Sequence, residues 1–125
     1  MNRLLPVLAL LPCLLAVSPA TQAEWFKGVT HVHSLWSDGD TAPEMIAAWY
    51  KDRGYDFMCF SEHHVLQEHD RFVIIQEETK LTAADVAAIK ERFGEDWVET
   101  QEEEGALRMR LKTHEELKAH FEEPG

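Results

Sequence analysis

The order of apolar and polar positions near the start of the chain predicts a strand, a helix and a second strand. We expect the first strand over residues 25–33 and the helix over residues 41–53. Residues 55–61 form a short apolar run, which is typical of a strand that is buried on both faces of a sheet. A strand, a helix and a strand within about forty residues indicate a right-handed βαβ unit with parallel strands. The pattern therefore predicts an α/β fold.

The helix of this unit carries start and stop signals in its own sequence. Thr41 can cap the first turn, Pro43 suits the first helical positions, and Gly54 suits the position after the last turn. Large apolar side chains recur at i, i+4 spacing and predict one apolar helix face: Met45, Ile46, Trp49 and Tyr50.

The rest of the chain predicts a loop, two further helices and a hairpin. Thr-x-x-Asp and Thr-x-x-Glu sequences suit capping boxes at the two helix starts. The second arm of the hairpin alternates apolar and basic side chains, which is typical of a half-exposed strand. We expect a loop over residues 65–80, helices over 82–93 and 113–122, and hairpin arms over 97–100 and 107–112, with a turn near Glu104 and Gly105.

The first 23 residues have the three-part pattern of a secretory signal peptide. A short positive start precedes an apolar run over residues 4–17, and small residues then allow cleavage after Ala20 or Ala23. The apolar run is shorter than the ~20 residues that a membrane span needs, which favours cleavage over an uncleaved anchor. We therefore expect an exported protein, periplasmic or secreted, with no membrane contact after cleavage.

Composition narrows the possible partners and the chemistry of the mature chain. The formal net charge is −11 at pH 7, which opposes binding to nucleic acid and to anionic membranes because both need basic surface. Cleavage would leave Cys59 as the single cysteine, so no internal disulfide is expected. Cys59 lies in the apolar run 57–60, and we expect it to be a small buried core residue. The oligomeric state stays open.

Two clusters of polar residues follow the two predicted parallel strands. His31 and His33 close the first strand at i, i+2 spacing, which puts both side chains on one face with Cα atoms ~6.6 Å apart. Asp38 follows in a Ser-Asp-Gly turn, and Glu62 with His63 closes the second strand. Because parallel strands end at the same edge of a sheet, these side chains should meet there. Imidazoles and a carboxylate so placed predict a site for divalent metal.

The two blocks together resemble the PHP (polymerase and histidinol phosphatase) superfamily of metal-dependent hydrolases. The block over residues 28–39, Gly-Val-Thr-His-Val-His-Ser-Leu-Trp-Ser-Asp-Gly, is similar to the family's opening His-x-His block with its Ser-Asp-Gly tail. Residues 60–64, Phe-Ser-Glu-His-His, are similar to its second block, in which Asp usually stands where Glu62 stands here. The resemblance covers residues 25–66.

The resemblance implies a distorted β/α barrel that holds two or three divalent metals at the carboxyl ends of its strands. His31 and His33 would share one metal, Asp38 would bind a neighbouring metal, and His63 would be a further ligand. Glu62 would orient a ligand histidine through its free ring nitrogen, and His64 would be a contact for substrate phosphate. Imidazole ligands suit Zn²⁺, Mn²⁺ or Fe²⁺, whereas Mg²⁺ prefers oxygen.

The activity implied by the resemblance is hydrolysis of a small phosphorylated substrate by water that the metals activate. Cleavage of the signal peptide leaves 102 residues, and a β/α barrel needs at least ~200. We therefore expect residues 24–125 to be the amino-terminal part of such a domain, inactive by itself. The alternative hypothesis is a noncatalytic exported module that binds zinc.

Overall fold

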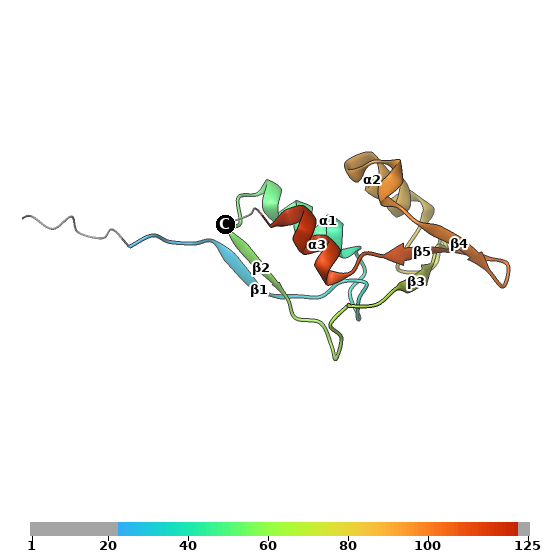
Figure 1. Ribbon diagram of the computed structural model, residues 1–125, viewed down its shortest axis with the longest axis horizontal. Coiled ribbons are helices and arrows are strands. Elements are labelled where there is room, and N and C mark those ends of the chain that lie inside the picture. Colours follow the sequence, from blue (N-terminus) through green and yellow to red (C-terminus); the bar gives the residue numbers. More distant parts are fainter. Residues whose placement is uncertain (1–22, 123–125) are drawn as a thin grey trace, which may run out of the picture.

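The structure is a computed structural model that describes residues 23–122, so the predicted signal peptide lies outside the described residues except for Ala23. Within this range, no helix combines the length and the apolar character that crossing a membrane requires. The chain has a mixed α/β fold with two small open sheets (Figure 1). Its elements are β1 (Gly28–Val32), α1 (Pro43–Asp52), β2 (Phe57–Phe60), β3 (Arg71–Ile74), α2 (Ala83–Phe93), the 3₁₀ turn η1 (Glu95–Trp97), β4 (Thr100–Glu103), β5 (Ala106–Leu111) and α3 (His114–Phe121).

The predicted strand–helix–strand unit is confirmed, with β1 and β2 paired in parallel and α1 between them in sequence. Gly28 pairs with Phe57, and Val32 pairs with Phe60 after an irregularity in the register. The Phe57 ring packs over Gly28, so that a Cβ at this position would lie within 2.4 Å of the ring and would displace it. The parallel pairing brings the carboxyl ends of both strands to one edge, while closure into a barrel stays a prediction.

The start of α1 and its buried face differ from the prediction. Ala42, not Thr41, is the N-cap residue, and no side chain caps the helix, which begins with Pro43. Ala47 and Ala48 belong to the buried face, whereas Trp49 is 49% exposed. The i, i+4 spacing of the large apolar side chains predicted that Trp49 would be buried. Trp49 instead stacks against the Arg53 guanidinium, whose central carbon lies 3.8 Å from the centre of the Trp49 ring. Small residues therefore make up part of the buried face of this helix, in place of the large apolar side chains that the pattern predicted.

The expectation that β2 is buried on both faces is wrong. Its residues alternate between exposed and half-buried, and Phe57 is 50% exposed. Cys59 is an exposed free thiol, so its prediction as a core residue is also wrong. The physical reason is the size of the sheet: within the described residues it has two strands, so β2 is an edge strand.

The second sheet has the order β3-β5-β4 and is antiparallel throughout. The hairpin of β4 and β5 is confirmed, although its first arm begins at Thr100 rather than Trp97. Its turn residues Glu104 and Gly105 have φ values of 53° and 75°, the left-handed backbone that a two-residue hairpin turn needs. β3 was expected to be loop. Its apolar run Phe-Val-Ile-Ile was the signal that could have revealed it.

Both remaining helices begin as predicted. Thr82 caps α2 and Thr113 caps α3, each in a capping box whose acidic partner stands three residues later. Gly94 ends α2 with a φ of 97°.

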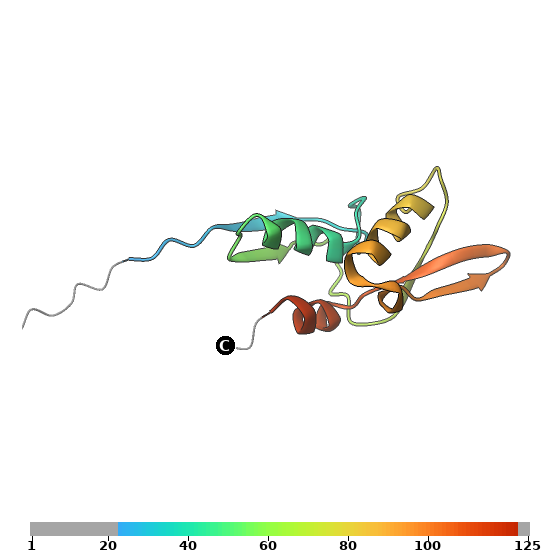
Figure 2. The ribbon, with the colours of Figure 1, turned by 90° about the horizontal axis from the view of Figure 1, so that it is seen from above.

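The hydrophobic core is formed by residues from the loop between β1 and α1, from α2 and the segment before it, from β5 and from α3. Figure 2 shows these segments from above. Trp36, in the loop after β1, is only 2% exposed and its ring packs on Phe60, with centroids 4.8 Å apart. Its Nε1 donates to the carbonyl of Lys112 at 2.8 Å. Leu81, Ile89, Met109 and Leu111 complete the most buried part. The loop after β1 is thus anchored in the core of the second sheet.

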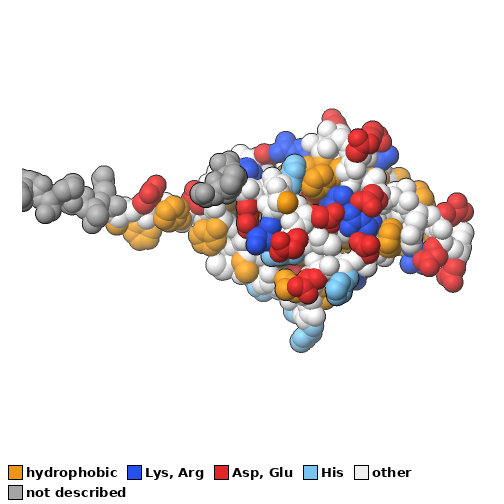
Figure 3. All heavy atoms as spheres, viewed as in Figure 1, with side chains coloured by type: hydrophobic (Ala, Val, Ile, Leu, Met, Phe, Trp, Pro, Cys, Tyr) orange, Lys and Arg blue, Asp and Glu red, His pale blue; other side chains and the backbone are white. Residues whose placement is uncertain are grey.

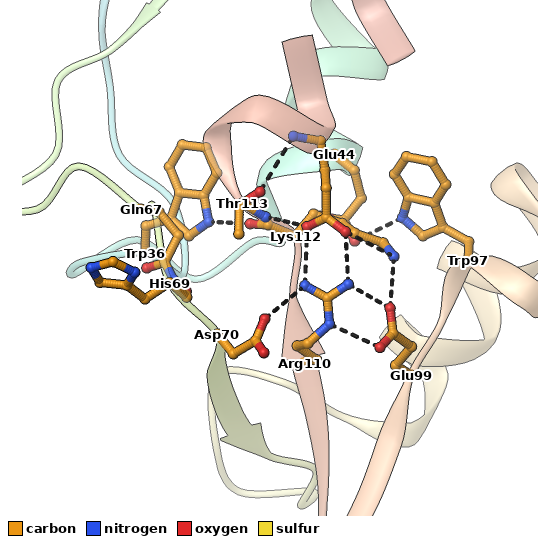
Figure 4. Close-up of polar contacts among 11 residues, drawn as sticks. Trp36, Glu44, Gln67, His69, Asp70, Trp97, Glu99, Arg110, Lys112 and Thr113 are labelled. Carbon is orange, nitrogen blue, oxygen red and sulfur yellow. Dashed lines mark hydrogen bonds and ion pairs between the residues drawn. The ribbon is translucent and has the colours of Figure 1, made fainter. Parts of the chain in front are cut away.

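A network of charged residues joins β5 to α3 and to the loop after η1 (Figure 4). Arg110 donates two hydrogen bonds to Glu116, at 2.7 and 3.0 Å, and others to Glu99 and Asp70. The hydrogen bonds from Arg110 lower the pKa of Glu116 to about 2. The stabilisation that this ion pair contributes is therefore present above the ordinary glutamate pKa and is lost as the pH falls towards 2.

Glu44 in α1 is the opposite case, because it is 1% exposed and its carboxylate is hydrogen-bonded to one side chain, Trp97, among the described residues. Trp97 Nε1 donates to its Oε1 at 3.2 Å, while Oε2 has no partner among the described residues. Burial raises the pKa of this carboxyl, although Lys112 opposes that shift and Glu116 adds to it. The folded chain therefore holds this proton more tightly than the unfolded chain does.

Replacing Glu44 with glutamine is expected to reduce the loss of stability at rising pH. In the parent protein, the contribution of Glu44 is complete below the unfolded pKa and is lost as the pH rises through the folded pKa. Glutamine keeps an acceptor for Trp97 and carries no charge, so we expect the stability of Glu44→Gln to fall less than that of the parent as the pH rises above the ordinary glutamate pKa. Urea unfolding between pH 4 and 8 measures this. Parallel pH profiles for the two proteins would contradict the prediction.

Candidate metal centre

Three histidine rings come together at the carboxyl ends of β1 and β2. His31 is the fourth residue of β1, His33 follows its last residue, and His63 lies three residues after the end of β2. The ring centroid of His33 lies 4.7 Å from that of His31 and 4.6 Å from that of His63. Figure 3 shows histidine side chains on and beside the protruding loop that follows β2 in Figure 1. The predicted convergence of the two clusters is thus observed.

Asp38 is returned to the strand ends by a tight turn after His33. Ser37 N donates to the Ser34 carbonyl at 3.1 Å, and Leu35 N donates to the Thr41 carbonyl at 3.0 Å, which closes the loop. Gly39 is required because a Cβ there would lie 2.6 Å from the backbone of His33 and Ser34. The turn that carries Asp38 therefore packs directly against the backbone of His33 and Ser34.

His33, Asp38 and His63 form the group whose geometry suits a metal. Their potential ligand atoms all lie within 4.8 Å of one another. Asp38 Oδ1 is 2.6 Å from His33 Nδ1, and Asp38 Oδ2 is 3.4 Å from His63 Nε2. The hydrogen bond with His33 is the main cause that lowers the pKa of Asp38, so this carboxyl favours its charged form.

His33 also carries a buried nitrogen without a partner. Its Nε2 is inaccessible to solvent and makes no hydrogen bond with the described residues. If Nδ1 donates its proton to Asp38, Nε2 keeps a free electron pair, which is the state in which imidazole binds a metal. An unsatisfied buried nitrogen is costly, and a bound cation would satisfy it.

His31 is close to this group but stands outside it. Its side chain leaves the same side of β1 as His33, in agreement with the i, i+2 prediction. Its Nδ1 lies 3.1 Å from Ser61 Oγ, so this nitrogen faces the end of β2. Of the four predicted ligands, three therefore share one potential coordination sphere and His31 borders it.

Glu62 and His64 have surroundings that differ from those expected. The carboxylate of Glu62 accepts hydrogen bonds from Ser34 and Ser37, and not from a histidine. His64 is exposed in left-handed backbone, with φ 53°, and its ring centroid is 6.5 Å from that of His63.

Two basic residues support the loop of Asp38 and were missed in the sequence. Lys80 Nζ donates to the Asp38 carbonyl at 2.6 Å, and Arg71 donates to the Trp36 carbonyl. Both come from segments more than thirty residues away. Nothing in their local sequence signals these contacts, because each depends on how β3 and the turn before α2 pack against the loop.

The donor set fits a divalent transition metal. Two imidazoles and a carboxylate are ligands that Zn²⁺, Mn²⁺ and Fe²⁺ accept, and three protein ligands leave positions for water and substrate. Comparison with family models, with curated proteins and with solved structures found no match to the chain. The chemistry of this site is therefore argued from its own residues.

Proposed function

We propose that the chain carries metal ligands of a metal-dependent phosphoesterase that acts on a small phosphorylated substrate. The observation that carries the proposal is the cluster of His33, Asp38 and His63 at the shared edge of two parallel strands. The resemblance of residues 25–66 to the PHP blocks supplies the reaction class. His31 borders the cluster and is a candidate ligand of a second metal.

In this proposal, His33 and His63 would hold the metal with neutral imidazole rings. Asp38 would be the third ligand and would bring a negative charge to the site. A divalent metal supplies activation of water and stabilisation of charge on phosphoryl oxygens. His64, which is exposed beside His63, is a candidate contact for substrate phosphate.

The proposal is tested by measuring hydrolysis of a chromogenic phosphoester by the complete protein, by which we mean the full protein that contains this chain. We expect no activity after treatment with a chelator, recovery on addition of Mn²⁺ or Zn²⁺, and at least about a 100-fold loss in Asp38→Asn. The matched control is Asp40→Asn, which changes an exposed acid of the same loop outside the cluster. Activity that survives chelation, or full activity in Asp38→Asn, would contradict it.

A noncatalytic zinc-binding module is the second candidate, and the exposure of the site favours it. The side chains of Asp38 and His63 are 61% and 60% exposed. The cavity of about 700 Å³ in the described part of the chain lies elsewhere, between α1, β2 and α3. Tight zinc binding without hydrolysis of any phosphoester by the complete protein would support the module and overturn the phosphoesterase.

A further inference from the structure

We propose that Glu62 is a positioning residue, which holds the loop of Asp38 against the end of β2 through Ser34 and Ser37. This inference rests on the proposed metal centre and assigns the hydrogen-bond network that shapes it. Glu62 adjoins His63, and Ser34 adjoins His33. One carboxylate therefore connects the two halves of the site.

The contacts of Glu62 are short and use both of its oxygens. Oε1 accepts from the backbone N of Ser34 at 2.7 Å and from the Ser34 hydroxyl at 2.6 Å. Oε2 accepts from the hydroxyl of Ser37, the residue before Asp38. Hydrogen bonds to a charged acceptor are about twice as strong as neutral ones.

The surroundings of Ser34 make this anchor rigid. Its side chain is fully buried, and its hydroxyl also accepts from Trp36 N at 3.1 Å while it donates to Glu62. Trp36 in turn is fixed in the core. The carboxylate is thus joined through one buried serine to the best-packed part of the molecule, and through Ser37 to the turn that carries Asp38.

A ligand role for Glu62 agrees less well with these contacts. Its two oxygens already accept three hydrogen bonds, and Glu62 does not belong to the group of atoms that lie within 4.8 Å of one another. Nor does it contact a ring nitrogen of the histidines, so it does not orient them directly. Its influence on the metal would pass through the loop.

The first measurement needs no metal. The rings of His33 and His63, 4.6 Å apart, should give nuclear Overhauser contacts in the metal-free protein. We expect Glu62→Ala to weaken these contacts and to leave the far-ultraviolet circular dichroism unchanged. Glu68→Ala, an exposed acid of the following loop, is the matched control and should leave the ring contacts intact. Unchanged ring contacts in Glu62→Ala would overturn the proposal.

The second measurement follows binding of Co²⁺ and Zn²⁺. Loss of a residue that supports metal ligands typically lowers affinity about 10- to 100-fold, and we expect this range for Glu62→Ala. The absorption spectrum of bound Co²⁺ should keep its shape, because the ligands are unchanged. A changed spectrum would make Glu62 a ligand and overturn the positioning role.

A double-mutant cycle tests whether Glu62 affects metal affinity through its hydrogen bond with Ser37 or in another way. If Glu62 acts through Ser37, the double variant Glu62→Ala/Ser37→Ala should bind metal no more weakly than Glu62→Ala alone. Losses that add fully would overturn the proposal. Where Glu62→Ala fails to fold, Ser37→Ala by itself must lower affinity or weaken the ring contacts.

These results are distinguishable from failure of the proposed function. Metal binding that depends on Glu62, in a complete protein that hydrolyses no phosphoester, would overturn the phosphoesterase and support the positioning role. Hydrolysis that is lost on chelation but unaffected by Glu62→Ala would support the phosphoesterase and overturn the positioning role.

Discussion

Replacing His33 with alanine is expected to lower the affinity of the chain for Zn²⁺ by more than about 100-fold. Outer partners of metal ligands are worth about 10- to 100-fold in affinity, and loss of a ligand should exceed that range. His33 stands at the centre of the site, since its ring lies between those of His31 and His63 and its Nδ1 meets Asp38. Its buried Nε2 is the nitrogen without a partner.

Competition with a chromogenic chelator measures this affinity. Alanine variants of two other histidines show whether the loss is specific to His33. His120→Ala changes an exposed ring that packs against Trp97, remote from the site in sequence, and should leave zinc affinity unchanged. His31→Ala should have an intermediate effect, because His31 borders the three-residue group. A change of less than about 3-fold in His33→Ala would refute the assignment of the centre. Circular dichroism of the metal-free variants verifies that all of them fold.

The local signals of the sequence predicted those elements whose structure depends on neighbouring residues. Capping boxes set the starts of α2 and α3, and the left-handed turn at Glu104 and Gly105 set the hairpin. The parallel pairing of β1 with β2 followed from the chirality and length of the unit between them. The same pairing is why the ends of two distant segments could be expected to meet.

Burial was predicted less well, because it depends on what covers each element. An apolar run such as residues 57–60 has the same composition in a central strand and in an edge strand. In the described chain β2 is an edge strand, so Cys59 is exposed. Glu44 shows the converse, since a charged residue in the first turn of α1 would ordinarily face solvent and is instead buried beside Trp97.

The candidate site shows the same division between local and tertiary information. The i, i+2 spacing of His31 and His33 and the turn that carries Asp38 are local, and both were predictable from the sequence. The partners of Glu62 and the contact of Lys80 with the Asp38 carbonyl are tertiary. They depend on the path of the loop after β1, which the core fixes through Trp36.

Replacing Trp36 with alanine is expected to lower the free energy of unfolding by about 3–5 kcal/mol, the usual range for a buried tryptophan. The side chain is 2% exposed, packs on Phe60, and donates its indole proton to the Lys112 carbonyl. Trp36→Phe keeps most of the packing and leaves that carbonyl without its donor, so a smaller loss of about 1–3 kcal/mol is expected. Trp25→Ala, at a position that is 94% exposed, is the control and should change little.

Urea unfolding of the metal-free protein measures these three variants. Because Trp36 links the loop after β1 to the junction of β5 and α3, its loss should also disturb the placement of Asp38. We therefore expect Trp36→Phe, which still folds, to bind zinc more weakly than the parent. If Trp36→Ala were as stable as Trp25→Ala, Trp36 would contribute little to the stability of the core. The rigidity that we assign to the metal-binding loop would then have no structural basis.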